Sequence, residues 1–136
     1  ACNQCHPEKS TAWATRYLRE WYGEDLLDQP HYGEAFWAGR QQYPEAQQDL
    51  LRLGADPQEP PMVRATAISL LGGYPDQSTT DLLQRTVGDP DPLIRSHSAW
   101  AIRRIGGSAA ARMLDRQLER ETDPGVAEEI RRDAAG

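Results

Sequence analysis

The chain has 136 residues, of which 38% are hydrophobic and 26% charged, and its formal net charge is −6. This length allows one compact domain or two small coupled units, with the composition of an ordinary soluble globular protein. No apolar run approaches the roughly 18 residues of a transmembrane helix, and nucleic acid is disfavoured as a partner because phosphate binding needs a basic stripe. The chain opens at Ala1-Cys2 without an initiator Met, so we expect an excised fragment or a mature chain whose upstream part is missing.

The first motif along the chain is Cys2-Asn3-Gln4-Cys5-His6, a C-x-x-C-H sequence. Two thiols at this spacing reach the two vinyl groups of one porphyrin, and the next residue places an imidazole on the iron. We therefore expect covalent haem c, attached through Cys2 and Cys5, with His6 as the proximal iron ligand. The alternatives are a redox disulfide, which normally follows a strand that this chain lacks, and a zinc site, which needs a fourth ligand.

Aromatic residues divide the chain at about residue 43. Eight of the ten lie within residues 1–43, whereas residues 44–136 are built from Leu, Ile, Val and Ala. The first domain is expected to hold two helices, one beginning near Pro7 and the other running from about Tyr32 to Gln41. The first of these helices carries an apolar stripe at three- and four-residue spacing. The stripe residues are Trp13, Tyr17, Leu18, Trp21 and Tyr22.

The aromatic residues of the first domain suit a haem pocket. A porphyrin is a large apolar disc that must be shielded from water. We predict that Trp13, Phe36 and Trp37 pack against it, and an ordinary helix–helix core is the alternative for each.

The distal ligand of the iron is predicted to be His31. This residue follows Pro30 in the loop between the two expected helices, and a loop of that length can carry it back to the haem. An open iron, which would permit small-molecule reduction, is another reading. The other candidate ligands are His97, Met62, Met113 and a residue outside this chain.

From Pro44 onward the sequence repeats. Asp-Pro pairs begin at residues 56, 89 and 123, which are 33 and 34 residues apart, and each is expected in a turn before a helix. An apolar-Arg pair follows the first two, as Val63-Arg64 and Ile94-Arg95, and Val126-Ala127 stands at the third. A first helix precedes each turn, over residues 44–53, 79–87 and 109–120. The expected core residues are Leu50, Leu51, Leu53, Val63, Ala67, Leu70, Leu71, Leu82, Leu83, Ile94, Ser98, Ala101, Ile102, Ile105, Met113, Leu114, Leu118, Val126, Ile130 and Ala134.

These helix pairs resemble HEAT repeats, particularly the short bacterial kind of the phycobilisome-lyase-like proteins, over about residues 44–136. The resemblance rests on the Asp-Pro turns, the apolar-Arg pairs and the closing Ala101-Ile102 and Ile105-Gly106, whereas the first pair departs at Gly72-Gly73-Tyr74. The last pair is polar and Ala-rich, as in a capping repeat. We therefore expect an all-α fold, a haem-bearing helical hairpin followed by a short HEAT-like α-solenoid of three helix pairs.

A wider resemblance covers nearly the whole chain. The segment Ala1-Cys2-Asn3-Gln4-Cys5-His6-Pro7-Glu8-Lys9-Ser10, with Trp13, Glu20-Trp21-Tyr22-Gly23 and Pro30-His31-Tyr32-Gly33-Glu34-Ala35, resembles the C-terminal region of bacterial multihaem cytochromes c. In that family a last C-x-x-C-H leads into a Trp-rich helix pair and HEAT-like repeats. The resemblance implies bis-His haem iron, further haems upstream and a location outside the cytoplasm, periplasmic or extracellular.

The predicted function is electron transfer through the covalent haem. We expect the protein to be an electron carrier rather than an enzyme, and the repeats to be a docking scaffold. Its partners would be upstream haem domains of the same polypeptide or other redox proteins, and an oligomer is compatible with the sequence. Two alternatives stay open. The repeats could form a protein–protein interaction module without a redox role, or the chain could be the tail of a multihaem reductase.

Overall fold

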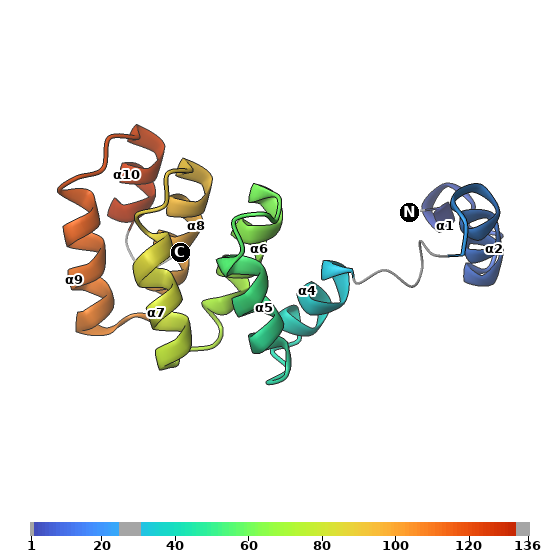
Figure 1. Ribbon diagram of the computed structural model, residues 1–136, viewed down its shortest axis with the longest axis horizontal. Helices are drawn as coiled ribbons and strands as arrows, with labels where there is room; N and C mark the ends of the chain where they lie inside the picture. The colour runs from blue at the N-terminus through green and yellow to red at the C-terminus, as the bar shows by residue number, and fades with distance from the viewer. Residues whose placement is uncertain (1, 25–30, 133–136) are drawn as a thin grey trace. The chain divides into compact units, whose positions relative to one another are not determined.

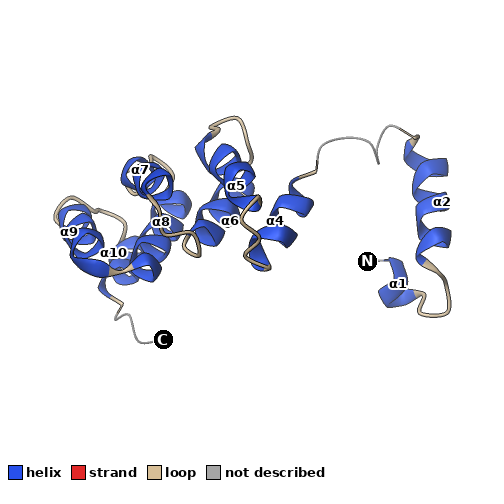
Figure 2. Cartoon of the chain, turned by 90° about the horizontal axis from the view of Figure 1, so that it is seen from below, coloured by secondary structure: helices blue, strands red, loops and turns tan. Residues whose placement is uncertain are grey.

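The computed structural model describes residues 2–24 and 31–132, and of residues 2 and 3 the backbone alone. Over these residues the regular structure is entirely helical (Figures 1 and 2), which confirms the all-α expectation. The chain divides into two compact units, which we call the N-terminal unit (Ala1–His31) and the repeat unit (Tyr32–Gly136). None of the helices in the described ranges is long and apolar enough to cross a membrane.

The N-terminal unit contains the helices α1 (Cys2–Cys5) and α2 (Thr11–Tyr22). Helix α2 begins later than the expected start near Pro7, because the Ser10 side chain accepts a hydrogen bond from the Trp13 backbone N–H at 3.2 Å and caps the helix. It ends at Gly23, whose φ of +88° is in the region that favours glycine. No residue of α2 is buried, so its aromatic side chains are accessible along the helix.

The repeat unit is a stack of helices in two layers (Figures 1 and 2). The first helices of the three pairs, α5, α7 and α9, form one layer, and the second helices, α6, α8 and α10, form the other. Helix α8 packs against both α6 and α10, so the second helices make a continuous row. The seven helices described in this unit are α4 (Tyr32–Arg40), α5 (Ala46–Ala55), α6 (Pro61–Leu71), α7 (Gln77–Thr86), α8 (Pro92–Ile105), α9 (Gly107–Leu118) and α10 (Pro124–Arg131).

Proline begins each of the second helices, at Pro61, Pro92 and Pro124. The first turn of a helix tolerates proline because its N–H groups have no partner within the helix. In the third pair the predicted Asp-Pro is itself the helix start, and Asp123 accepts two backbone hydrogen bonds there, at 2.9 and 3.0 Å. In the first two pairs the Asp-Pro lies earlier in the turn, because a second proline stands where the helix begins.

The core of the repeat unit follows the predicted apolar pattern. Leu50, Leu71, Ile94 and Ile102 are fully or almost fully buried, whereas Leu51, Leu70, Ile105, Leu114 and Leu118 are only partly buried at its edge. The one predicted core residue outside the described residues is Ala134. The other predicted residues that are buried are Leu53, Val63, Ala67, Leu82, Leu83, Ser98, Ala101, Met113, Val126 and Ile130.

Helix α4 belongs to the repeat unit, where it packs on α5 and α6. Phe36 is 8% exposed and joins the same buried cluster as Leu50. Gly39 permits this close approach, since a Cβ atom there would lie 2.9 Å from a methyl carbon of Leu50. The repeat unit therefore begins at Tyr32. This residue lies inside the first domain, residues 1–43, that we expect from the distribution of aromatic residues.

A series of ion pairs, which we call the arginine ladder, ties each helix pair to the next. Arg64 of α6 binds Asp89 at 2.8 Å, and Arg95 of α8 binds Glu121 through two nitrogens, each at 2.8 Å. Arg103 of α8 binds the carboxylate of Glu129 at 2.8 Å and its backbone carbonyl as well. Both Arg residues of the predicted apolar-Arg pairs, Arg64 and Arg95, thus join neighbouring repeats, and Arg103 adds a third link.

Candidate functional site

The C-x-x-C-H motif is at the start of the N-terminal unit. Its cysteines are the first and last residues of α1, one helical turn apart, and the Cys5 thiol is exposed. The side chain of Cys2 lies outside the described atoms. The His6 ring is exposed and its centroid is 5.2 Å from that of Trp13.

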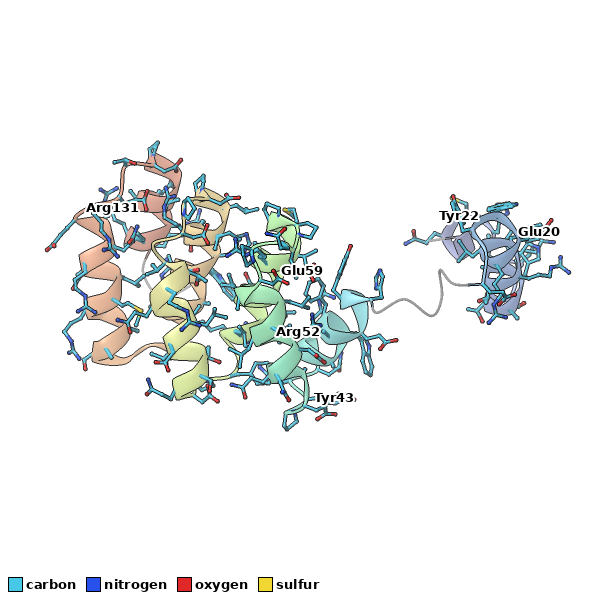
Figure 3. All side chains as sticks on the ribbon, in the orientation of Figure 1. Glu20, Tyr22, Tyr43, Arg52, Glu59 and Arg131 are labelled. Atoms are coloured by element: carbon cyan, nitrogen blue, oxygen red, sulfur yellow. The ribbon has the colours of Figure 1, made fainter. Side chains whose placement is uncertain are left out.

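An aromatic row continues from His6 along α2. Trp13 and Tyr17 have ring centroids 5.0 Å apart, and Tyr17 and Trp21 follow at 5.5 Å. The row ends at Trp21, which is 65% exposed, beside the equally exposed Tyr22 (Figure 3). Four rings in sequence thus contact one another on the surface of this unit.

The other predicted haem-packing residues lie in the repeat unit and have different roles there. Phe36 is a core residue, with its ring 5.4 Å from that of Tyr32. Trp37 is exposed, and its ring lies edge-on to the ring of Tyr43, with 5.5 Å between the centroids. Tyr43 is in the turn after α4 (Figure 3). His31 is exposed at the end of the N-terminal unit.

Electrostatics in the repeat unit centre on Glu121. Its side chain is 1% exposed, and hydrogen bonds from Arg95 lower the pKa of Glu121 to about 2. The backbone N–H of Asp123 and the amide of Gln117 also donate to this carboxylate, at 2.9 and 2.8 Å. Because its oxygens are occupied by these hydrogen-bond donors, we assign the Glu121 carboxylate a structural role.

The outward side of the row of second helices, which we call the second-helix face, carries the residues Met62, Thr66, Ser69, His97, Trp100 and Arg104. Ser69 Oγ of α6 lies 2.6 Å from His97 Nδ1 of α8. Burial lowers the pKa of His97 below its ordinary value, whereas the nearby charge of Glu129 on α10 raises it.

Trp100 is the large aromatic side chain of this face, and it is 38% exposed. The guanidinium carbon of Arg104, one turn further along α8, lies 5.4 Å from the centroid of the Trp100 ring. This pair was not among the residues predicted from the sequence. The available signal was a single Trp among Leu, Ile and Ala, with an Arg four residues later on the same helix face.

The alternative iron ligands also fall in the repeat unit. Met113 is a core residue, as expected, but Met62 is 66% exposed, because its helix turns it towards the second-helix face. His97 is half-buried and hydrogen-bonded to Ser69. Within the described part of the chain, no group of three or more His, Cys, Asp or Glu side chains is placed to hold a metal ion.

Several curated proteins are similar to part of the chain. The epoxyqueuosine reductase of Listeria monocytogenes is 36% identical over 69 residues, which are 50% of this chain and 18% of that protein. The epoxyqueuosine reductase of Bacillus subtilis is 38% identical over 65 residues, 45% of this chain and 16% of its own length. An uncharacterized protein in the gldA 3' region of Geobacillus stearothermophilus is 38% identical over 69 residues, 50% of this chain and 32% of that protein. The chain therefore spans less than a third of the length of these relatives.

These relatives contradict the predicted function. Those with a named activity are epoxyqueuosine reductases rather than cytochromes, so the predictions of electron transfer through haem c, of haem c as the cofactor and of a metal-binding multihaem cytochrome are wrong. The physical reason is that a C-x-x-C-H sequence permits haem attachment without requiring it, since paired thiols at this spacing suit other chemistry. The predicted redox partners depended on the same haem.

The repeats themselves are the part of the prediction that the comparisons support. No solved structure matches the chain. The family model of HEAT repeats matches residues 49–133, which is more than half of the sequence and includes most of the repeat unit. This chain belongs to the HEAT-repeat family.

Proposed function

We propose that the repeat unit is a non-catalytic scaffold that binds another polypeptide on its second-helix face. A stack of helix pairs offers an extended surface whose shape is fixed by the packing between neighbours. A surface of this kind can bind a partner by its shape, without catalytic side chains. The cluster of buried residues behind it keeps α6 and α8 in place.

The arginine ladder supports this function because a rigid surface loses less entropy on binding. Arg64, Arg95 and Arg103 are each 12–13% exposed in their side chains and reach into the following helix pair. Sliding of one pair against the next would leave buried charges without partners, which is costly. We therefore expect the spacing between the second helices to be preserved when a partner binds.

The observation that carries the proposal is the exposure of Trp100 in the middle of the row of second helices. A tryptophan on the surface exposes a large apolar area to water. Tryptophan is also enriched among the residues that dominate protein interfaces. Met62 adds a second exposed apolar side chain on the neighbouring helix.

The test is a selection of random 12-residue peptides on the immobilised chain. We expect enriched peptides whose binding is lost in Trp100→Ala and retained in Trp37→Ala, which removes an exposed tryptophan from α4. Failure to enrich any peptide, or equal loss in both variants, would contradict the proposal. Thermal unfolding of both variants checks that each one folds.

A second candidate function follows from the named relatives. The 36% identity to the Listeria monocytogenes epoxyqueuosine reductase over 69 residues supports a repeat unit that serves a reductase of that kind. This candidate is tested by supplying epoxyqueuosine and a reductant to the protein as its source cell makes it. Consumption of epoxyqueuosine, followed by mass spectrometry, is the expected result, and its absence would remove the candidate.

Several other expectations stay predictions. Cys2, Cys5, His6 and His31 stay candidate site residues, and the periplasmic or extracellular location, the domain boundary at residue 43 and an oligomeric state likewise await measurement. Intact-mass analysis of native material tests the two cysteines, because any group attached through a thiol adds its mass.

A further inference from the structure

The arginines of α6 and α8 fall into two groups. Arg64, Arg95 and Arg103 each bind a carboxylate of the next helix pair at 2.8 Å and are nearly buried. Arg104 is exposed, and no carboxylate among the described residues pairs with it. One guanidinium of this row is therefore left with its charge directed to solvent.

Arg104 is held in place by contacts other than ion pairs. Its guanidinium group lies over the Trp100 ring, with 5.4 Å between the central carbon and the ring centroid. Its aliphatic part runs close to the end of α6, since a Cβ atom on Gly72 would lie only 3.2 Å from Arg104 Cδ. A guanidinium group over a ring still carries its N–H donors at its edge, in the arrangement that matches a carboxylate.

We infer that Trp100 and Arg104 together form a docking point for an acidic polypeptide segment, in which an Asp or Glu lies beside an apolar side chain. The inference rests on the proposed function and gives the chemistry of the partner. The carboxylate accepts hydrogen bonds from the Arg104 guanidinium, and the apolar side chain covers the exposed part of the Trp100 ring. Charge-assisted bonds of this kind fix both the position and the orientation of a partner.

The charge distribution favours a polypeptide over a nucleic acid. A nucleic acid needs several cations to replace its counterions, whereas the other arginines of α6 and α8 are occupied by carboxylates. A single accessible guanidinium beside an apolar ring matches one carboxylate and one apolar side chain.

The experiment compares two degenerate pools of fluorescein-labelled 12-residue peptides on the immobilised full chain. The pools are identical except that one holds Asp and Glu where the other holds Asn and Gln. We expect the acidic pool to be retained about fivefold better, as for one accessible ion pair at an interface. This preference is expected to vanish in Arg104→Gln and to persist in Arg112→Gln, which removes an exposed arginine of α9. Unfolding midpoints confirm that both variants fold.

Each other outcome is decisive. Equal retention of the two pools, with loss of both in Trp100→Ala, overturns the acidic partner and leaves the scaffold standing. Retention of neither pool overturns the scaffold as well. A labelled 12-nucleotide oligouridine forms a third arm, and if it is retained better than the acidic pool and lost in Arg104→Gln, the partner is a nucleic acid and the inference is wrong.

Discussion

Glu121 is the most buried carboxylate of the arginine ladder, with 1% of its side chain exposed. Replacing it by glutamine removes the carboxylate that is hydrogen-bonded to the nearly buried Arg95 guanidinium and leaves only the more distant charges of Asp123 and Asp89. Because breaking one side of a buried pair is costly, we expect Glu121→Gln to lower the free energy of unfolding by about 3 kcal/mol. Urea denaturation followed by circular dichroism measures this change.

The matched control is the exposed pair of Asp49 and Arg52 on α5, whose nitrogen and oxygen are 3.9 Å apart. Exposed pairs contribute little, so we expect Asp49→Asn to change the free energy of unfolding by less than about 0.5 kcal/mol. Similar losses in both variants would mean that the ladder is no more important than any surface pair.

His97 makes the stability of the repeat unit depend on pH. Because burial lowers the pKa of His97, the unfolded chain binds this proton more readily than the folded one. Its contribution is therefore fully present above the ordinary histidine pKa of about 6.5 and is lost as pH falls towards the folded-state value. We expect the urea midpoint to fall between pH 7.5 and 5.5, and His97→Gln to reduce that fall. An unchanged slope would show that Ser69 and Glu129 accommodate the protonated ring.

At the scale of one helix, Asp123 determines where α10 begins. Its carboxylate accepts backbone hydrogen bonds from Gly125 and Val126, two donors that have no partner within the helix. Asp123→Ala is expected to cost about 1 kcal/mol of stability, whereas Glu128→Ala, on the exposed side of the same helix, is expected to cost far less. Differential scanning calorimetry of the two variants makes the comparison, and equal midpoints would rule out a capping role.

The helices of the repeats were predictable because each depends on local signals. The spacing of apolar residues predicted the core positions, and the Asp-Pro pairs predicted the turns between the helices. Helix α4 was harder, because its own sequence does not reveal that Phe36 and Gly39 pack on α5 and α6. That packing depends on the distance of approach between helices, which a period of apolar residues does not encode.

At the scale of the whole molecule, two fragments distinguish the alternative boundaries. Residues 32–136 retain α4, whereas residues 44–136 lose Phe36 from the core. Removing a buried phenylalanine costs about 3 to 5 kcal/mol, so we expect the longer fragment to unfold at a clearly higher urea concentration. Equal midpoints would support the boundary at residue 43.

The candidate site was less predictable than the fold. The sequence directed attention to Cys2, Cys5 and His6, because a short motif with a definite chemistry is easy to recognise. Trp100 and Arg104 belong to no motif, and their relation depends on the exposed side of α8 and on the space that Gly72 leaves for the arginine stem. Such a surface is visible only after the helices are stacked.

Hydroxyl-radical footprinting tests the second-helix face most directly, because the chain carries exposed tryptophans on three different helices. With the acidic peptide pool bound, we predict slower oxidation of Trp100 and unchanged oxidation of Trp21 and Trp37. Protection of Trp21 or Trp37 with Trp100 unaffected would contradict the account, because the partner would then lie elsewhere on the protein.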